Sequence, residues 1–99
     1  MIRFPDPLQF EWDDGNRDKN WLKHGVSAAE TEVVFFDADK KLAKDIIHST
    51  DDEQHFILLG NTRLGRLLFI VFTVRNRNVQ VISARDMKNT ERPLYEKGN

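Results

Sequence analysis

The chain has 99 residues, of which 39% are hydrophobic and 31% charged, and its formal net charge is −1. This composition is typical of one soluble globular domain and excludes a disordered chain. Cysteine is absent, which excludes a disulfide-bonded secreted scaffold, a thiolate metal site and a cysteine nucleophile. The sequence contains neither a signal-peptide core nor an apolar run of about 20 residues. We therefore expect a cytoplasmic protein that does not enter a membrane.

The two halves of the chain carry opposite charge. Residues 1–55 have 7 Lys and Arg against 13 Asp and Glu, whereas residues 56–99 have 8 against 3. The planar guanidinium of arginine can bind a phosphate through two parallel hydrogen bonds. The second half is therefore a candidate phosphate-binding surface, although solvated hairpin ends would explain the same charges equally well. Six of its cations are arginines: Arg63, Arg66, Arg75, Arg77, Arg85 and Arg92.

The N-terminal segment predicts an arm, a short strand and a helix. Residues 1–9 contain two prolines, so we expect them to form a loosely held arm. The alternation of apolar and acidic residues in 10–12 is typical of a strand with one buried face. The Asp13-Asp14 pair can cap a helix that runs to about Lys23, and Gly25 is placed to end it in a left-handed conformation.

A second helix and a sheet follow. Ser27 to Glu30 has the pattern of a capping box, and the helix that it opens should end before residues 37–39. The connections between the later strands are short, which predicts antiparallel neighbours and an α+β domain with two N-terminal helices packed on the sheet. Residues 67–74 are almost continuously apolar, which predicts a strand covered on both faces. The expected elements are strands at 42–47, 55–59, 66–75 and 79–85, and a short C-terminal helix within 89–97. Pro93 either restricts that helix to a start near Arg92 or forces a distorted turn.

Several kinds of site are disfavoured by the spacing of the candidate residues. The three histidines, at 24, 48 and 55, do not have the spacing of metal ligands. No segment has the Gly-Lys-Ser/Thr ending of a phosphate-binding loop, and no Gly-x-Ser-x-Gly motif surrounds a serine. We therefore expect no metal and no cofactor.

The arginines on the last two long strands are the best candidates for chemistry. Alternation predicts that Val81, Ser83 and Arg85 share one face, and hairpin pairing predicts that Arg66 lies at the same end of the sheet as Arg85. Two guanidinium groups that converge there would stabilise the charge that develops on phosphorus during metal-free RNA cleavage. Such cleavage also needs a proton acceptor and a proton donor. Tyr95, Glu91 and His24 are candidates, although His24 at a helix C-terminus can equally be a favourable interaction with the helix dipole.

Several short motifs, taken together, resemble the BrnT toxin family. The resemblance extends over about residues 10–96. Its most specific signatures are Trp12-Asp13, Lys23 to Ser27, and Ile82 to Arg85. The other matching residues are Phe10-Glu11, Asn20, Val34-Phe35, Gly65 to Leu68, Phe72-Thr73, Arg75, Glu91, Arg92 and Tyr95.

The resemblance implies a RelE-like or barnase-like ribonuclease fold and the toxin half of a type II toxin–antitoxin pair. Such a toxin cuts RNA and thereby inhibits translation. The partner that the family implies is a BrnA-like antitoxin with a ribbon-helix-helix domain, and operator DNA is contacted only through that antitoxin.

The resemblance also implies which residues act: His24, Arg66, Arg75, Arg85, Glu91 and Tyr95. Their roles are our inference. Arg66 and Arg85 would bind and stabilise the scissile phosphate, and Tyr95, Glu91 or His24 would transfer protons. Further RNA-binding cations are Arg63, Arg75 and Arg92.

The chain departs from the family pattern at Asn16, Ala28, Asp86 and Pro93. A carboxylate at Asp86 is expected to pair with the adjacent Arg85 and to compete there with phosphate. The alternative hypothesis is therefore an attenuated relative that acts as a non-catalytic protein or nucleic-acid interaction module. A DNA-binding regulator is disfavoured because the cations lie on strands and loops rather than on a basic recognition helix.

Overall fold

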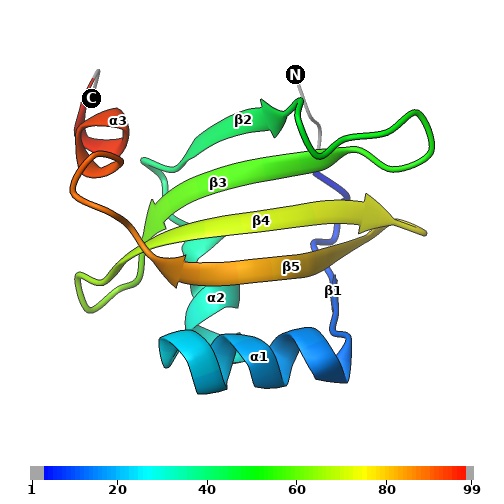
Figure 1. Cartoon of the computed structure of the whole chain (residues 1–99), viewed down its shortest axis with the longest axis horizontal. Helices are drawn as coiled ribbons and strands as arrows, with labels where there is room; N and C mark the ends of the chain where they lie inside the picture. Colours follow the sequence, from blue (N-terminus) through cyan, green and yellow to red (C-terminus); the bar gives the residue numbers. More distant parts are fainter. Residues whose placement is uncertain (1–3, 98–99) are drawn as a thin grey trace.

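The computed structural model describes residues 4–97, and these residues form an α+β domain, as the sequence predicts. A five-stranded sheet has the order β1-β5-β4-β3-β2, in which β2 to β5 are antiparallel neighbours and β1 pairs with β5 in parallel. Figure 1 shows the sheet with α1 below it and α2 behind it. The elements are β1 (Phe10–Glu11), α1 (Asp14–His24), α2 (Ala28–Val34), β2 (Lys41–Asp45), β3 (His55–Asn61), β4 (Leu67–Arg75), β5 (Asn78–Asp86) and α3 (Arg92–Glu96).

Local sequence signals set the ends of the first two helices. The Asp13 side chain accepts a hydrogen bond from the Asn16 backbone N–H at the start of α1, and Gly25 ends the helix with φ 62°. A left-handed φ of this kind costs glycine little because it has no Cβ. Ser27 and Glu30 form the predicted capping box of α2. The first helix extends to His24, one residue beyond the expected end.

One face of the sheet packs against α1 and α2 to form the main core. Val26, Val34 and Phe35 come from the helical layer and are almost fully buried. Phe72, at the centre of the core, contacts the rings of Phe35 and Phe56 with centroid separations of 5.1 and 5.6 Å. The sheet residues of the core are Leu58, Leu68, Ile70, Phe72, Val79, Val81 and Ala84.

The prediction that β4 is covered on both faces is wrong. Residues of β4 alternate between fully buried and half-buried, because the second face of the sheet carries only α3 at one end. There Tyr95 and Met87 pack with Leu59 against Leu67 and Phe69. The remainder of this second face, which we call the open face, is exposed to solvent. The apolar run in β4 therefore reflects one buried face and one partly covered one.

The prediction that Val81 shares a face with Ser83 and Arg85 is also wrong. Val71 pairs with Ser83, but the next residue of β4, Phe72, pairs with Val81, so Ile82 is an extra residue and forms a β-bulge. Val81 is consequently buried in the core while Ser83 and Arg85 lie on the open face. Side chains of α1 bond to the backbone around the bulge: Asn20 Oδ1 accepts from the Ala84 N–H, and Lys19 Nζ donates to the Ile82 carbonyl.

The described part of the expected arm contacts the core. Phe4 stacks on Phe72 with a centroid separation of 5.8 Å, and Leu8 packs against the same cluster. Residues 1–3, where the arm was expected to begin, lie outside the described residues. Within residues 4–97, none of the helices has the length and apolar character needed to cross a membrane.

Candidate functional site

The open face contains a hollow of about 460 Å³ that brings polar groups together over an apolar floor. Ile57, Phe69 and Val71 form the floor, and Arg85 and Ser83 project from β5. Because neighbouring strands place paired residues on the same face, the pairs Ile57–Val71 and Phe69–Arg85 set this arrangement. The hollow is completed by Asp45, His48, His55 and Ile82.

Arg85 lies within the hollow and is held by an acidic partner. Its guanidinium carbon lies 4.1 Å from the centroid of the Phe69 ring, and two of its nitrogens donate to the two carboxylate oxygens of Glu91, each at 2.8 Å. Hydrogen bonding to Arg85 lowers the pKa of Glu91, and the same bonds raise the pKa of Arg85. At neutral pH this is an ion pair in which Glu91 can accept a proton but has none to donate.

Asp86 does not form the expected pair with Arg85. Its backbone carbonyl accepts from Arg85, whereas its carboxylate accepts from Nε and Nη2 of Arg66 at 2.7 and 3.1 Å. Asp86 lies opposite Leu68 on the helix-covered side of the sheet, and Arg85 lies opposite Phe69 on the open face. The expectation failed because adjacent residues of a strand point to opposite faces.

Arg66 joins the end of the sheet to both N-terminal helices. Nη1 donates to the Gly25 carbonyl at 2.9 Å and to Glu30 Oε2 at 3.2 Å, and Nη2 donates to the His24 carbonyl at 3.0 Å. With Asp86, these contacts use the whole guanidinium fork on protein groups. The pKa of Asp86 is lowered chiefly by Arg66, and the pKa of Glu30 is lowered by its bond to the Ser27 backbone and by Arg66.

Arg66 and Arg85 lie at the same end of the sheet, as predicted, but their guanidinium groups do not converge. Arg66 bonds to groups at the α1–α2 junction, behind the sheet, whereas Arg85 stacks on Phe69 on the open face. Arg66 lies two residues before Leu68 and therefore on the face of Leu68 and its partner Asp86, whereas Arg85 pairs with Phe69 on the opposite face. The two cations therefore cannot hold one phosphate in this arrangement.

Tyr95 projects from α3 and is buried against the sheet rather than placed in the hollow. Its hydroxyl donates to Asp37 Oδ2 at 2.7 Å, and Asp37 also accepts from the Asn61 backbone N–H. Burial and the bond to Asp37 raise the pKa of Tyr95 above its ordinary value, so the phenol retains its proton throughout the physiological range. This contact fastens α3 to the end of α2.

Replacing Tyr95 by phenylalanine tests this structural contact. The change removes the bond to Asp37 while keeping the ring, so we expect Tyr95→Phe to lower the free energy of unfolding by about 1 kcal/mol. Urea unfolding followed by circular dichroism measures the change. A stability equal to that of the wild type would show that the hydroxyl contact contributes nothing.

The remaining candidates are spread over the molecule. His24 ends α1, where its carbonyl accepts from Arg66, and Arg92 adds to the effect of Arg66 in lowering the pKa of Asp86. Arg63 is exposed in the turn between β3 and β4, and Arg92 is exposed at the start of α3. Arg75 ends β4 at the far end of the sheet and pairs with Glu53.

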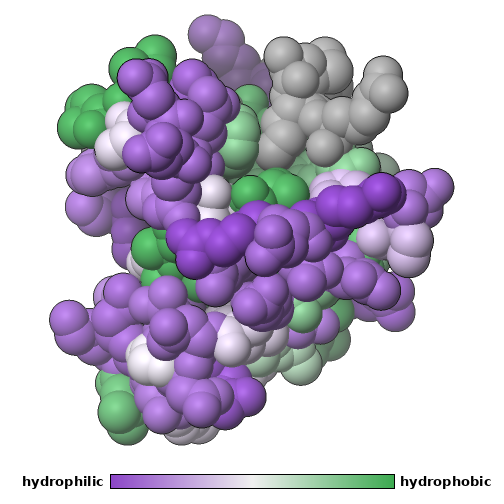
Figure 2. Space-filling view, turned by 90° about the vertical axis from the view of Figure 1, so that its right-hand side faces the viewer, coloured by the Kyte–Doolittle hydropathy of each residue, from purple (hydrophilic) through white to green (hydrophobic). Residues whose placement is uncertain are grey.

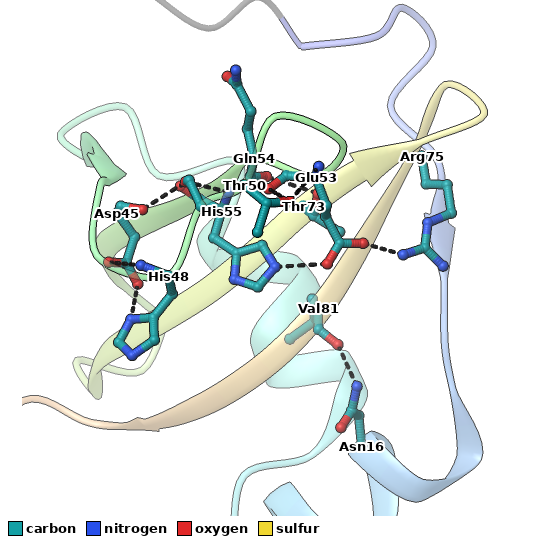
Figure 3. A network of polar contacts seen from close by, with 11 residues as sticks. Asn16, Asp45, His48, Thr50, Glu53, Gln54, His55, Thr73, Arg75 and Val81 are labelled. Carbon is teal, nitrogen blue, oxygen red and sulfur yellow. Dashed lines mark hydrogen bonds and ion pairs between the residues drawn. The ribbon is translucent and has the colours of Figure 1, made fainter.

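Sequence reasoning missed the polar cluster at that far end. Glu53, His55, Asp45 and His48 lie together there, with Arg75 beside Glu53 (Figure 3). Two of the histidines were considered only as metal ligands and were rejected by their spacing. The alternation of His55, Ile57 and Leu59 along β3 was a usable signal, because it places His55 on the same face as the half-buried apolar residues. No group of three or more potential metal ligands occurs among residues 4–97.

Comparison with known proteins identifies the family. The family model described as "Ribonuclease toxin, BrnT, of type II toxin-antitoxin system" matches residues 12–91. The chain belongs to the BrnT family of ribonuclease toxins.

A solved structure agrees with this assignment at the level of the fold. The crystal structure of the Brucella abortus ribonuclease toxin BrnT is similar over 83% of this chain and 99% of that one, with a TM-score of 0.61 and 21% sequence identity. No curated protein is similar enough to the chain to count as a match.

The BrnT signatures in this chain mostly build the scaffold. Trp12 Nε1 donates to Glu32 at 2.7 Å and ties the start of the chain to α2. Gly25 and Ser27 end one helix and begin the next, and Val26 between them is buried in the core. Ile82 forms the bulge of β5 that places Ser83 and Arg85 on the open face.

Proposed function

We propose that this BrnT-family toxin is a metal-independent endoribonuclease that binds RNA across the open face of its sheet. The observation that carries the proposal is a single hollow lined by Arg85, which stacks on the Phe69 ring, and by two histidines. An arginine stacked on an aromatic ring suits RNA, because the cation attracts a phosphate and the ring holds the guanidinium in place. The side of the molecule that carries the β4–β5 turn, which adjoins the open face, is mostly hydrophilic (Figure 2).

In this proposal Arg85 binds an RNA phosphate and Glu91 holds the guanidinium ready. When RNA is absent, the carboxylate of Glu91 keeps the Arg85 guanidinium over the Phe69 ring. When RNA binds, a phosphate oxygen takes one or both of these hydrogen bonds from Arg85. Exposed Arg63 and Arg92 attract the RNA backbone from the surrounding surface. Arg66, whose fork is occupied by protein groups, positions the end of the sheet instead of touching RNA.

Membership of the BrnT family supports a proposal for the cellular role. We propose that cleavage of RNA inhibits translation and growth in the cytoplasm, and that a BrnA-like ribbon-helix-helix antitoxin neutralises the toxin. Operator DNA is contacted by the antitoxin and not by this chain. The exposed apolar side chains Phe36, Ile46 and Ile47, on the helical and β2 edges, are suited to protein contact.

Paired variants of Arg85 and Glu91 test the phosphate contact. We expect Arg85→Ala to weaken binding of a short single-stranded RNA about tenfold and to reduce the salt dependence of binding by one phosphate contact. Glu91→Gln removes the anion that competes with phosphate, so binding should become roughly threefold tighter. Fluorescence anisotropy of labelled RNA at several salt concentrations measures both changes.

Arg77→Ala provides the matched control, because Arg77 lies exposed in the turn between β4 and β5 and does not line the hollow. If Arg77→Ala and Arg85→Ala lower the affinity for RNA equally, Arg85 contributes only general electrostatic attraction and makes no specific phosphate contact. Unchanged binding in Arg85→Ala would contradict an RNA site at this hollow.

A non-catalytic interaction module is the second candidate function. It is favoured by one observation: Arg66 and Arg85, the two cations that the family resemblance assigns to the scissile phosphate, are both neutralised by carboxylates. This candidate predicts that the purified chain binds RNA or an antitoxin and leaves RNA intact.

A further inference from the structure

Two histidines on the open face are each held by a carboxylate. His55 Nε2 lies 2.8 Å from Glu53 Oε2, and His48 Nδ1 lies 2.8 Å from Asp45 Oδ2. Figure 3 shows both pairs in front of the sheet, with one ring nitrogen of each histidine directed to its carboxylate. A carboxylate on one ring nitrogen fixes the imidazole and leaves the other nitrogen to exchange protons with a ligand.

Strand pairing places both histidines on the hollow that contains Arg85. Asp45 pairs with His55 across β2 and β3, so the two side chains lie on the same face. His48 follows in the turn after β2, where its backbone N–H also donates to Asp45. His48 and His55 therefore line the hollow together with Ile57, Val71 and Ser83. Their side chains are 69% and 18% exposed, so both can be reached from solvent.

A cation completes the cluster. Arg75, from the end of β4, donates to the Glu53 carboxylate oxygen that His55 does not use. Hydrogen bonds from His55 and Arg75 hold the pKa of Glu53 below its ordinary value, so Glu53 is an anion at neutral pH. The cluster thus combines two imidazoles and a guanidinium, which are the groups that metal-free RNA cleavage uses for proton transfer and charge stabilisation.

We propose that His55 and His48 are the proton-transfer residues of RNA cleavage in this protein and that Arg75 binds the scissile phosphate; this proposal rests on the proposed ribonuclease function. His55 accepts the proton of a ribose 2′-hydroxyl, whose oxygen forms a bond to phosphorus. The bond between phosphorus and the 5′-oxygen breaks, and protonated His48 donates its proton to that oxygen. The products are a 2′,3′-cyclic phosphate and a 5′-hydroxyl, so no water, metal or redox partner enters the step.

The assignment of base and acid follows from the shared carboxylate. We assign His55 as the acceptor because it shares Glu53 with Arg75, the cation that binds the scissile phosphate beside the reacting 2′-hydroxyl. Glu53 and Arg75 face His55 from the loop before β3 and from β4, and Asp45 faces His48 from β2.

Kinetics on a defined RNA oligonucleotide test the proposal. We expect His55→Ala and His48→Ala each to lower kcat at least about 100-fold, with KM changed less than threefold. Free imidazole should restore part of the activity of His55→Ala, which a purely structural role would not allow. Glu53→Gln, which acts through His55, should lower kcat and leave KM unchanged. The 3′ ends of wild-type products should carry a 2′,3′-cyclic phosphate.

Gln54→Ala is the matched control, because Gln54 is exposed beside His55 and its side chain points away from both histidines (Figure 3). Binding of an oligonucleotide with 2′-deoxy sugars, which cannot be cleaved by this route, shows that each variant still binds. His48 is largely exposed, so its replacement keeps the test decisive even if His55→Ala fails to fold.

The outcomes separate this proposal from the proposed function. Wild-type cleavage that persists at the same rate in both histidine variants, or products with 5′-phosphate ends, would overturn the two-histidine assignment while the ribonuclease function stands. A folded wild type that neither binds nor cleaves RNA would overturn both.

Discussion

Arg66→Ala is expected to lower the free energy of unfolding by about 2 to 3 kcal/mol. Its side chain is 28% exposed and bonds two carboxylates and the carbonyls of His24 and Gly25. The change removes the Arg66 donor from these acceptors at the α1–α2 junction, where Glu30 keeps only its bonds from Ser27. Because the Asp86 side chain is 61% exposed, water replaces most of that part of the interaction. Most of the loss therefore comes from Glu30 and the two carbonyls.

The pH dependence of this loss has a definite sign. Glu30 and Asp86 have lowered pKa values in the folded protein, so their pairing with Arg66 contributes stability above the pKa values of the unfolded chain. This contribution disappears as the pH falls through the lowered folded values. The stability difference between wild type and Arg66→Ala should be largest near neutral pH and should shrink in acid.

Chemical denaturation of both proteins at neutral pH and at low pH measures this prediction. Arg63→Ala is the matched control, because Arg63 is exposed in the adjacent turn; its stability should stay within about 0.5 kcal/mol of the wild type. Contrary evidence would be an Arg66→Ala protein of wild-type stability that has lost RNA cleavage, since Arg66 would then act on phosphate as the family resemblance implied.

Phe72→Ala is expected to lower the free energy of unfolding by about 3 to 5 kcal/mol. This is a larger loss of stability than we expect for Arg66→Ala or Tyr95→Phe. Phe72 is 0% exposed and contacts the rings of Phe4, Phe35 and Phe56. Truncation to Cβ leaves a cavity between the helical layer and the sheet. Small domains have about 5 to 15 kcal/mol of stability in total, so a loss of this size leaves a marginally folded protein.

Thermal and urea unfolding measure the effect, with Phe72→Leu as a milder core variant. Phe36→Ala is the control, since Phe36 is 64% exposed at the end of α2 and its removal should change stability by less than about 0.5 kcal/mol. Equal stability of Phe72→Ala and wild type would mean that the helices do not pack on the sheet as described.

Much of the fold could be predicted because its signals are local. Asp13, Gly25 and the Ser27–Glu30 capping box mark helix ends through contacts within a few residues. The strands and their antiparallel order followed from apolar runs and short connections. These features depend on residues that are close in the sequence, so a single sequence is enough to predict them.

The site was harder to predict because it depends on register between distant segments. Because Ile82 is an extra residue in β5, Val81 faces the core whereas Ser83 and Arg85 lie on the open face. Arg66 and Arg85 were assigned to one clamp because both lie at the same end of the sheet, but the pairing of Phe69 with Arg85 puts them on opposite faces. The Glu53–His55 and Asp45–His48 pairs need the tertiary structure, since their significance comes from the hollow that they share with Arg85.

Production of the chain alone in a bacterial host, with growth and total RNA followed over time, tests the central claim most directly. We expect growth arrest and loss of intact RNA with the wild type, and normal growth with His55→Ala and His48→Ala produced at equal level. Normal growth and intact RNA with a folded wild-type protein would contradict a ribonuclease toxin that acts through the open face of its sheet.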